Sequence, residues 1–358
     1  TFPPDLKGRY QVRVKVNDGV YDSSYATTII TAEDPNDKQL IELGFDVTAS
    51  AFSEQLNKVV LVAANPNQLI LLDVADSSIE TIPLAASSSV LEISLSGTTA
   101  AVGYANSVAI IDLLNKQVTA TYSVSSDIID LALPDNGYLY VFPSTDQWAR
   151  IRTIELASGA ETEHTGNSIY AGTRVVAHPS GEFIYGADNG LSPSDIELYD
   201  ISGGNAHYVR DSPYHGDYDM CGNVWISEDG ANLFTPCGNI FKANPGQADD
   251  MQYVGRLGIT GAIKALSQKN DEIALSNTEA WWYYGNAEIG HIIHLYNYPS
   301  LAFVRAVEIP TTTINGTVFK NYGVNLFHTL DGSKIIALVK IDSAAGRLHE
   351  YSLFVYAK

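Results

Sequence analysis

Residues 214–241, YHGDYDMCGNVWISEDGANLFTPCGNIF, decide how the rest of the chain is interpreted. Within this stretch, residues 223–227 form a short run of branched and aromatic side chains that is typical of a β-strand. Residues 228–231 (EDGA) have turn chemistry, because Gly230 accepts a positive φ without a Cβ clash. Residues 232–235 then resume the extended pattern. The stretch therefore predicts a β-hairpin that folds at Gly230.

The only two cysteines of the chain flank this hairpin. Folding at the turn brings Cys221 and Cys237 almost opposite each other. Cross-strand Cβ atoms lie about 4.5–5.5 Å apart, and a modest twist brings such a pair to disulfide geometry. We expect a disulfide here, and two reduced, buried cysteines are the alternative. Two cysteines without a CxxC motif do not suggest a zinc site.

The composition indicates a globular β-protein and argues against two kinds of partner. Hydrophobic residues make up 45% of the 358 residues, and the chain has 21 tyrosines. The formal net charge of −20 disfavours nucleic acid and anionic membranes as partners. No apolar run reaches the roughly 18–20 residues that span a bilayer. The chain starts at Thr1 and has no signal-peptide pattern, so we expect a processed chain or a piece of a longer precursor.

A unit of about 40 residues recurs from residue 38 onward. Each unit has short apolar runs, with a turn such as residues 179–181 (PSG) or 331–332 (DG) after the first run. Seven units without helical periodicity predict an all-β fold, a seven-bladed β-propeller over residues 36–358. The last unit lacks a fourth strand. Residues 39–43 have the character to supply it, which would join the two ends of the ring and remove two exposed edges.

Two parts of the sequence resemble known families. Residues 178–188, HPSGEFIYGAD, and the apolar runs ending in Asp resemble YVTN-type and WD40-like propellers, although no WD dipeptide is present. That resemblance implies a fold and almost nothing about function. Residues 4–23, PDLKGRYQVRVKVNDGVYDS, resemble the last two strands of PKD-like or cadherin-like immunoglobulin-type repeats in bacterial surface proteins. It implies that residues 1–35 end such a domain and that further repeats lie upstream. A purpose-built hairpin docked on the main domain is the alternative.

Long polar and aromatic loops predict the ligand-binding face. In such a blade, loops between strands two and three, and between successive blades, share one face of the disc. Long loops on a rigid scaffold commonly carry function, and adjacent aromatic rings stack on sugars or clasp peptides. The aromatic residues 281–284 could instead pack between blades without contacting a ligand. The candidate ligand-binding residues on this face are Trp148, Tyr214, His215, Asp217, Tyr218, Asp219, Trp281, Trp282, Tyr283, Tyr284 and His291.

An enzymatic alternative uses part of the same face. A His–Tyr pair drawn from Tyr214, His215 and Tyr218 could do the general acid–base work of a polysaccharide lyase or glycosidase. Asp217 and Asp219 lie two residues apart, so an extended segment would place them on one side. Such a pair suits a metal or a glycosidase, and any acidic loop has the same appearance.

Calcium is the one cofactor that the sequence suggests. Asp188 and Asp195 flank a Gly turn in a loop rich in oxygen ligands, although the spacing differs from that of an EF-hand. No GxSxG, HExxH, P-loop or dinucleotide motif occurs.

The sequence thus predicts a non-catalytic bacterial module at the cell surface, outside the cell or in the periplasm. It would act in binding or adhesion, recognising a glycan, a peptide or a neighbouring surface protein through the loop-rich face. The alternative is a secreted carbohydrate-active enzyme. In either case we expect the disulfide to pin the base of the loop at residues 211–220.

Overall fold

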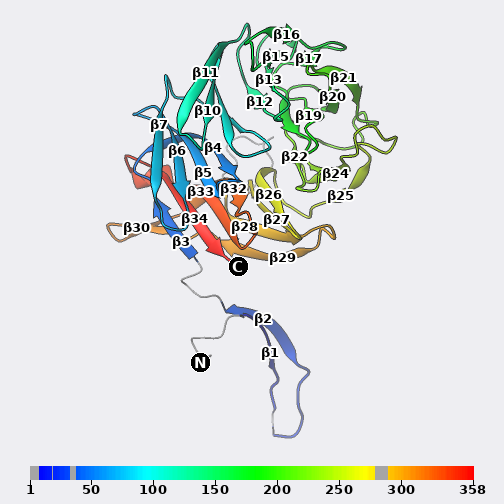
Figure 1. Cartoon of the computed structure of the whole chain (residues 1–358). Coiled ribbons are helices and arrows are strands. Elements are labelled where there is room, and N and C mark those ends of the chain that lie inside the picture. The colour runs from blue at the N-terminus through cyan, green and yellow to red at the C-terminus, as the bar shows by residue number, and fades with distance from the viewer. Residues whose placement is uncertain (1–7, 18, 33–37, 279–288) are drawn as a thin grey trace.

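The structure, a computed structural model, describes residues 8–17, 19–32, 38–278 and 289–358 (Figure 1). Seven four-stranded antiparallel sheets are arranged around a common axis in this part of the chain. The chain is therefore an all-β, seven-bladed β-propeller, as the repeat predicted.

Five blades use four consecutive strands of the chain, from the innermost to the outermost, and a sixth, blade three, does so with β14 (Trp148–Ala149) inserted between its second and third strands. Blade one is β4 (Asp46–Ser53), β5 (Lys58–Ala64), β6 (Gln68–Asp73) and β7 (Ile79–Pro83). Blade two is β8 (Val90–Ile93), β9 (Thr99–Gly103), β10 (Ser107–Asp112) and β11 (Gln117–Ser123). Blade three is β12 (Asp130–Ala132), β13 (Tyr138–Phe142), β15 (Arg152–Glu155) and β16 (Glu161–Glu163).

Blade four is β18 (Arg174–Ala177), β19 (Phe183–Ala187), β20 (Ile196–Asp200) and β21 (His207–Asp211). Blade five is β22 (Trp225–Ile226), β23 (Asn232–Phe234), β24 (Asn239–Lys242) and β25 (Tyr253–Arg256). Blade six is β26 (Ile263–Lys269), β27 (Glu272–Thr278), β28 (Ile289–Asn297) and β29 (Phe303–Glu308).

The seventh blade joins the two ends of the propeller. Its inner strands are β32 (Asn321–His328), β33 (Lys334–Ile341) and β34 (Tyr351–Ala357). The outermost strand is β3 (Lys38–Glu42), which pairs antiparallel with β34 in a register that places Leu40 opposite Phe354. The strand expected at residues 39–43 thus pairs with the last strand of the chain, and β3 covers the edge that β34 would otherwise leave unpaired.

The core lies between neighbouring blades. In β5 five consecutive residues are buried, because each blade is covered by another blade on both faces. Val60 of blade one packs with Val102 of blade two, and Leu61 packs on the other side with Ile336 of blade seven. Fully burying one such side chain contributes about 1.5–3 kcal/mol. The ring therefore provides a stiff support for its loops.

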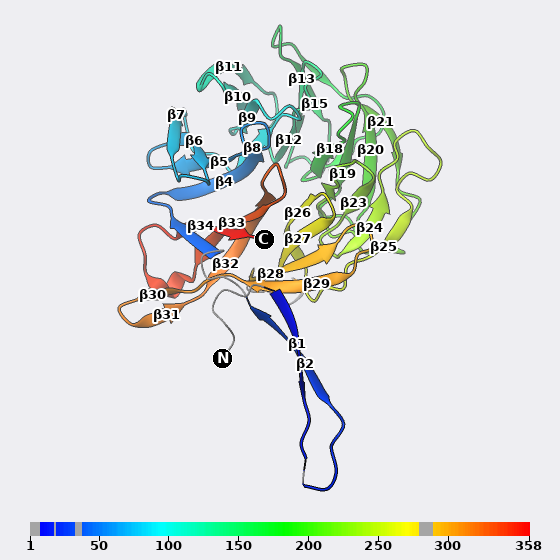
Figure 2. The ribbon, with the colours of Figure 1, turned by 60° about the horizontal axis from the view of Figure 1, so that its bottom comes forward.

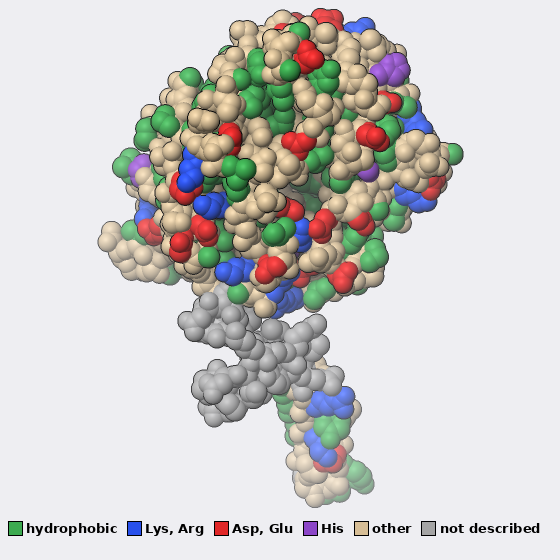
Figure 3. Space-filling model, in the orientation of Figure 1, with side chains coloured by type: hydrophobic (Ala, Val, Ile, Leu, Met, Phe, Trp, Pro, Cys, Tyr) green, Lys and Arg blue, Asp and Glu red, His purple; other side chains and the backbone are tan. Residues whose placement is uncertain are grey.

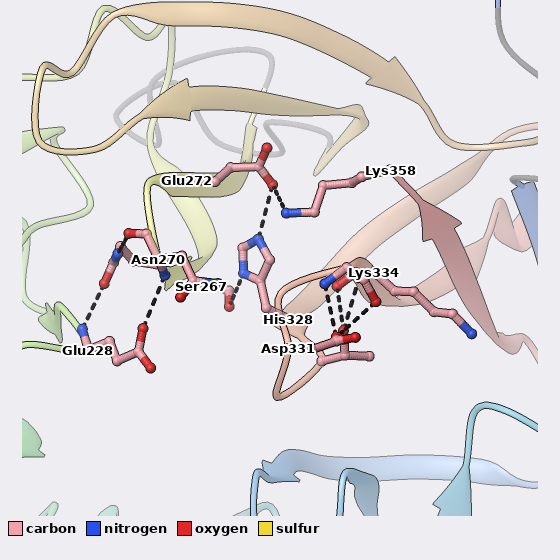
Figure 4. Close-up of polar contacts among 11 residues, drawn as sticks. Glu228, Ser267, Asn270, Glu272, His328, Asp331, Lys334 and Lys358 are labelled. Atoms are coloured by element: carbon pink, nitrogen blue, oxygen red, sulfur yellow. Dashed lines mark hydrogen bonds and ion pairs between the residues drawn. The ribbon is translucent and has the colours of Figure 1, made fainter. Parts of the chain in front are cut away.

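Hydrogen bonds also link the turns between first and second strands. The Gly230 amide donates to Ser227 O at 2.9 Å, and φ of Gly230 is 72°, as the hairpin at residues 223–235 predicted. The Gly230 carbonyl accepts a bond from His178 Nε2 of blade four at 3.2 Å. Figure 4 shows the same linkage further round, where His328 of blade seven lies between Ser267 and Glu272 of blade six. The turn-bearing face is thus tied together from blade to blade.

A buried cation reinforces this face. Lys269 is 5% exposed, and its ammonium contacts Glu54 Oε2 at 3.0 Å and Glu228 Oε1 at 2.5 Å. The three residues come from blades six, one and five. The cation therefore joins turns of three blades on this face, where hollows of about 110 Å³ and 540 Å³ also open.

Among the described residues, two hairpins and the short sheet of β14 and β17 (Ile169–Tyr170) lie outside the seven four-stranded sheets. The first, β1 (Gly8–Val14) paired with β2 (Ala26–Ala32), projects away from the disc (Figure 2). Near its turn Val16 and Tyr21 are 69% and 77% exposed. A two-stranded hairpin is marginally stable alone, so this one suits cover by further strands. The second hairpin, β30 (Thr312–Ile314) and β31 (Thr317–Phe319), lies at the rim. In the part of the chain that is described, no helix is long and apolar enough to cross a membrane.

Candidate functional site

Two adjoining hollows open on the loop-rich face. They have volumes of about 500 Å³ and 640 Å³. Both are walled by Leu191, Ser192 and Ser194, from the loop between β19 and β20, and by Cys221. The outer hollow is completed by Pro193, Gly216, Tyr218, Asp219, Cys237 and Arg256. The inner hollow lies at the inner ends of blades four, five and six, and is completed by Arg174, Asp188, Asn189, Gly190, Gly222, Asn223, Pro236, Ala262, Ile263, Lys264 and Thr278.

The predicted disulfide is present and forms part of this wall. Cys221 and Cys237 are bonded, with their Cα atoms 5.7 Å apart. The structure places both cysteines in connections rather than in the strands themselves. Cys221 precedes β22 and adopts φ = 65°, and Cys237 lies in the tight turn in which Gly238 N donates to Thr235 O at 2.8 Å. The bond therefore ties the connection between blades four and five to the turn between β23 and β24.

The loop between β19 and β20 is closed by its own acidic residues. The Asp188 amide donates to Asp195 O at 3.1 Å, and the Asp195 amide donates to Asp188 Oδ2 at 3.0 Å. Asp195 Oδ1 in turn accepts a hydrogen bond from Ser212 Oγ. These bonds give the shared wall of the two hollows a fixed shape. They also bring together the two residues suggested as calcium ligands, but no group of three or more His, Cys, Asp or Glu placed to hold a metal occurs among the described residues.

Asp188 is an unusual residue in this wall. It is 2% exposed, and its Oδ1 atom has no hydrogen-bond partner among the described residues. Burial raises the pKa of Asp188 to about 7; the amide of Asp195 opposes this, and the charges of Asp195 and Asp211 add to it. The carboxyl group is therefore partly protonated near neutral pH, which reduces the negative charge at the inner hollow.

Tyr214 and Tyr218 support the connecting loop from beneath. The Tyr214 hydroxyl accepts a hydrogen bond from Tyr253 N at 2.9 Å. The Tyr218 ring stacks on Tyr253, with centroids 4.1 Å apart and planes 8° apart, and meets Tyr214 edge-on at 4.7 Å. Phe241 completes the cluster. Both tyrosines are thus packed against blade five, and only Tyr218 reaches a hollow.

The polar candidates of the same loop are exposed. His215 and Asp217 lie at its tip, where the His215 amide donates to Asp217 Oδ2 at 3.2 Å. Asp219 lines the outer hollow, and its carbonyl is held by Asn239 Nδ2 at 2.7 Å. His215 lines neither hollow. The structure therefore does not gather Tyr214, His215 and Tyr218 around a common cavity.

The remaining candidates are scattered over the face. Trp148 lies in β14 (Trp148–Ala149), which pairs with β17 (Ile169–Tyr170) and borders a third, separate hollow. His291 is part of β28, where its carbonyl accepts a bond from Ile309 N at 2.9 Å. Trp281, Trp282, Tyr283 and Tyr284 lie outside the described residues.

Sequence reasoning missed the basic residues of the hollows. Lys264 and Arg256 are exposed, and neither forms an ion pair with another described residue. Arg174 is half-buried and donates from Nη1 to Ile129 O at 2.6 Å. Beside it, burial raises the pKa of Asp130 to about 6, and the charge of Arg174 opposes that rise. The net charge of −20 directs the interpretation of the sequence toward acidic residues. Only the positions of these cations near strand ends in the repeat could have indicated that they lie on the same face.

Comparisons with known proteins support the propeller fold and identify no function. No family model matches the chain, and no curated protein matches it by sequence. The chain is similar in structure to the β-propeller domain of Cps50 (Swd1) from Myceliophteria thermophila, with a TM-score of 0.63 and 10% identity over 90% of this chain and 99% of that one. It is similar to U3-55K, with a TM-score of 0.59 and 12% identity over 90% of this chain and 99% of that one. It is also similar to hydrazine synthase from Kuenenia stuttgartiensis, with a TM-score of 0.57 and 14% identity over 84% of this chain and 97% of that one. At such identities the likeness defines a class, the β-propellers, whose members have unrelated functions.

Proposed function

We propose that this chain is a non-catalytic binding module that holds its ligand on the loop-rich face of the propeller. The observation that carries the proposal is the pair of adjoining hollows whose common wall is fixed by the Cys221–Cys237 disulfide and by the Asp188–Asp195 loop. Concave sites with pre-formed walls and a few placed polar groups are typical of ligand binding. Lys264 and Arg256 supply cationic donors that form no ion pair with another described residue, and the exposed Gly190 and Gly216 allow close approach of a ligand to the backbone.

The arrangement favours binding over catalysis. General acid–base work needs a donor and an acceptor that both reach the reacting atoms. Here the Tyr214 hydroxyl is occupied by the Tyr253 amide, the Tyr218 ring is stacked, and His215 lines neither hollow. The secreted carbohydrate-active enzyme is therefore the less supported alternative.

We further propose an extracellular or periplasmic location, because disulfides form and persist in oxidising compartments. In this proposal the β1–β2 hairpin belongs to an immunoglobulin-like repeat of the same precursor, whose remaining strands would cover its exposed apolar residues. The partner bound by the propeller is a glycan or a protein.

The test is a pair of arrays, one of glycans and one of peptides, probed with the purified chain and with Arg256→Ala/Lys264→Ala. A parallel assay measures new reducing ends released from the same polysaccharides. We expect ligands that the wild type binds at least about tenfold more tightly than the double variant, without release of reducing ends. Arg305→Ala is the matched control, since that cation lies over the Tyr356 ring on the outer strands, away from both hollows. Turnover of any bound polysaccharide, or equal binding by the double variant, would contradict the proposal.

A further inference from the structure

A third hollow on the loop-rich face has features of its own. It has a volume of about 390 Å³, lies between blades two and three, and shares no lining residue with the two central hollows. The connection between β13 and β15 forms one side of it, and the connection between blades two and three forms the other. The space is large enough for one or two sugar rings.

Trp148 forms an aromatic platform at this hollow. Its side chain is 56% exposed, and the edge contact with Tyr170, at a centroid distance of 5.5 Å and an angle of 86°, holds the ring upright. The pairing of Trp148 with Tyr170 and of Ala149 with Ile169 fixes the backbone on which the ring stands. A large ring held rigidly and left exposed loses little conformational freedom when a ligand packs on it.

The polar groups around the platform are also held in place. Asp127 accepts hydrogen bonds from the Ser144 amide at 3.3 Å and from Thr145 Oγ1 at 2.9 Å, and from the Ser144 hydroxyl. Although burial acts in the opposite direction, these bonds lower the pKa of Asp127. Across the hollow, Arg150 Nη1 donates to Gly166 O at 2.7 Å. A fixed carboxylate and a fixed guanidinium provide strong acceptors and donors for hydroxyl groups.

The charges on the lining favour a neutral ligand. Asp127 and Asp146 stand against Arg150 and Arg152 in the lining, and Arg152 is already paired with Glu161 and Glu163, so the hollow has no surplus of positive charge to attract an acidic ligand. The whole chain carries −20, which repels anionic polymers at long range. On the face seen in Figure 3, acidic and basic side chains are also interspersed rather than gathered into one patch of a single sign. A neutral ligand that is rich in hydroxyl groups, such as an uncharged glycan, is not repelled in this way.

From these observations we propose that the Trp148 hollow is a subsite for one or two neutral pyranose rings of a glycan. The apolar face of a ring packs on Trp148, and its hydroxyl groups bond to Asp127 and Arg150. The inference rests on the proposed binding function and deepens it, because it selects a neutral glycan over a peptide or an acidic polysaccharide.

The test is isothermal titration calorimetry with neutral hexasaccharides of the cello, xylo, malto and manno series, with oligogalacturonate and with a library of unmodified peptides. The variants are Trp148→Ala, Trp148→Phe and Asp127→Asn. Phe303→Ala is the matched control, because Phe303 is also 56% exposed and also makes an edge contact, with Tyr296 at 5.5 Å, but lies on the outer strand of blade six. We expect Trp148→Ala to weaken binding of a neutral hexasaccharide by about tenfold or more, Trp148→Phe to restore part of the loss, and Phe303→Ala to have no effect. Thermal unfolding of each variant confirms that it is folded.

Each outcome decides one proposal or both. A neutral hexasaccharide that Trp148→Ala binds as the wild type does would overturn the subsite and leave the binding function in place. If the wild type binds only peptides or only oligogalacturonate, the neutral-glycan subsite is also overturned and the binding function remains. If the wild type binds no member of the three sets, and the arrays also find no ligand, both proposals fail.

Discussion

Replacing Asp188 by Asn should make the protein more stable at alkaline pH and flatten the pH dependence of its stability. Asn cannot ionise, yet its carbonyl can still accept the hydrogen bond from the Asp195 amide that Asp188 Oδ2 accepts at 3.0 Å. The wild-type carboxyl is 2% exposed and leaves Oδ1 without a partner among the described residues, so its charge is poorly solvated.

The sign follows from the direction of the shift. The pKa of Asp188 rises from 3.8 to about 7 on folding, chiefly through burial. Below its unfolded pKa the group is protonated in both states and costs nothing. Between the two values the unfolded state releases a proton that the folded state keeps, so stability falls as pH rises and the loss is complete above about pH 7.

The magnitude has a ceiling of about 4 kcal/mol, at 1.36 kcal/mol for each pKa unit. The observed effect should be smaller, because the hollow beside Asp188 is open to water and Asp195 and Glu197 titrate with it. We expect the variant to gain about 1–2 kcal/mol relative to wild type between pH 5 and pH 8. Urea unfolding at these two pH values measures it, and Asp219→Asn, an exposed aspartate of the neighbouring hollow, is the control. A stability difference between Asp188→Asn and wild type that is the same at both pH values would refute the reasoning.

Two further predictions concern the links between blades. Asp250→Ala should destabilise the protein by about 3 kcal/mol in urea unfolding, because Asp250 is 3% exposed and accepts bonds from Tyr185 Oη at 2.6 Å and Arg210 Nη2 at 2.8 Å. The adjacent Asp249 is only half-buried and pairs with the exposed end of Lys242, so it should cost less than about 1 kcal/mol when changed to Ala, and equal costs would contradict the network. Lys269→Met should cost about 1–3 kcal/mol at neutral pH, since it leaves two glutamates facing each other without their cation. Although burial opposes it, the Lys269 ammonium lowers the pKa of Glu228. The loss should therefore shrink in acid as Glu228 becomes protonated, and a loss that does not change with pH would exclude this cause.

The fold followed from the sequence because its determinants are local. Turns such as residues 228–231 and 331–332 carry their own Asp and Gly, and each apolar run of five or so residues is long enough for a strand buried on both faces. Two acids that end third strands also stabilise local turns: Asp73 accepts a hydrogen bond from Ala75 N, and Asp200 accepts one from Ser202 N. Ring closure through β3 needed only a count of strands.

The site was less accessible to sequence reasoning because it depends on contacts between blades. Tyr214 and Tyr218 belong to a polar loop. Nothing in that loop indicates that Tyr253, more than thirty residues later, stacks on the Tyr218 ring and donates its amide to the Tyr214 hydroxyl. The cations Lys264 and Arg256 looked unremarkable in an acidic chain until the propeller brought them to neighbouring hollows. The disulfide was predictable because both cysteines flank a single hairpin.

The measurement that tests the binding proposal most directly is the affinity of a Cys221→Ala/Cys237→Ala variant for every ligand that the arrays identify, taken with its thermal unfolding curve. The disulfide closes a loop with a sequence separation of 16, for which chain entropy gives roughly 3 kcal/mol. Most of the core lies in other blades, so the variant should still unfold in a cooperative transition. We predict a folded variant whose affinity falls by about tenfold or more, because the common wall of the two hollows is no longer fixed. A folded variant that binds those ligands as tightly as the wild type would contradict the account.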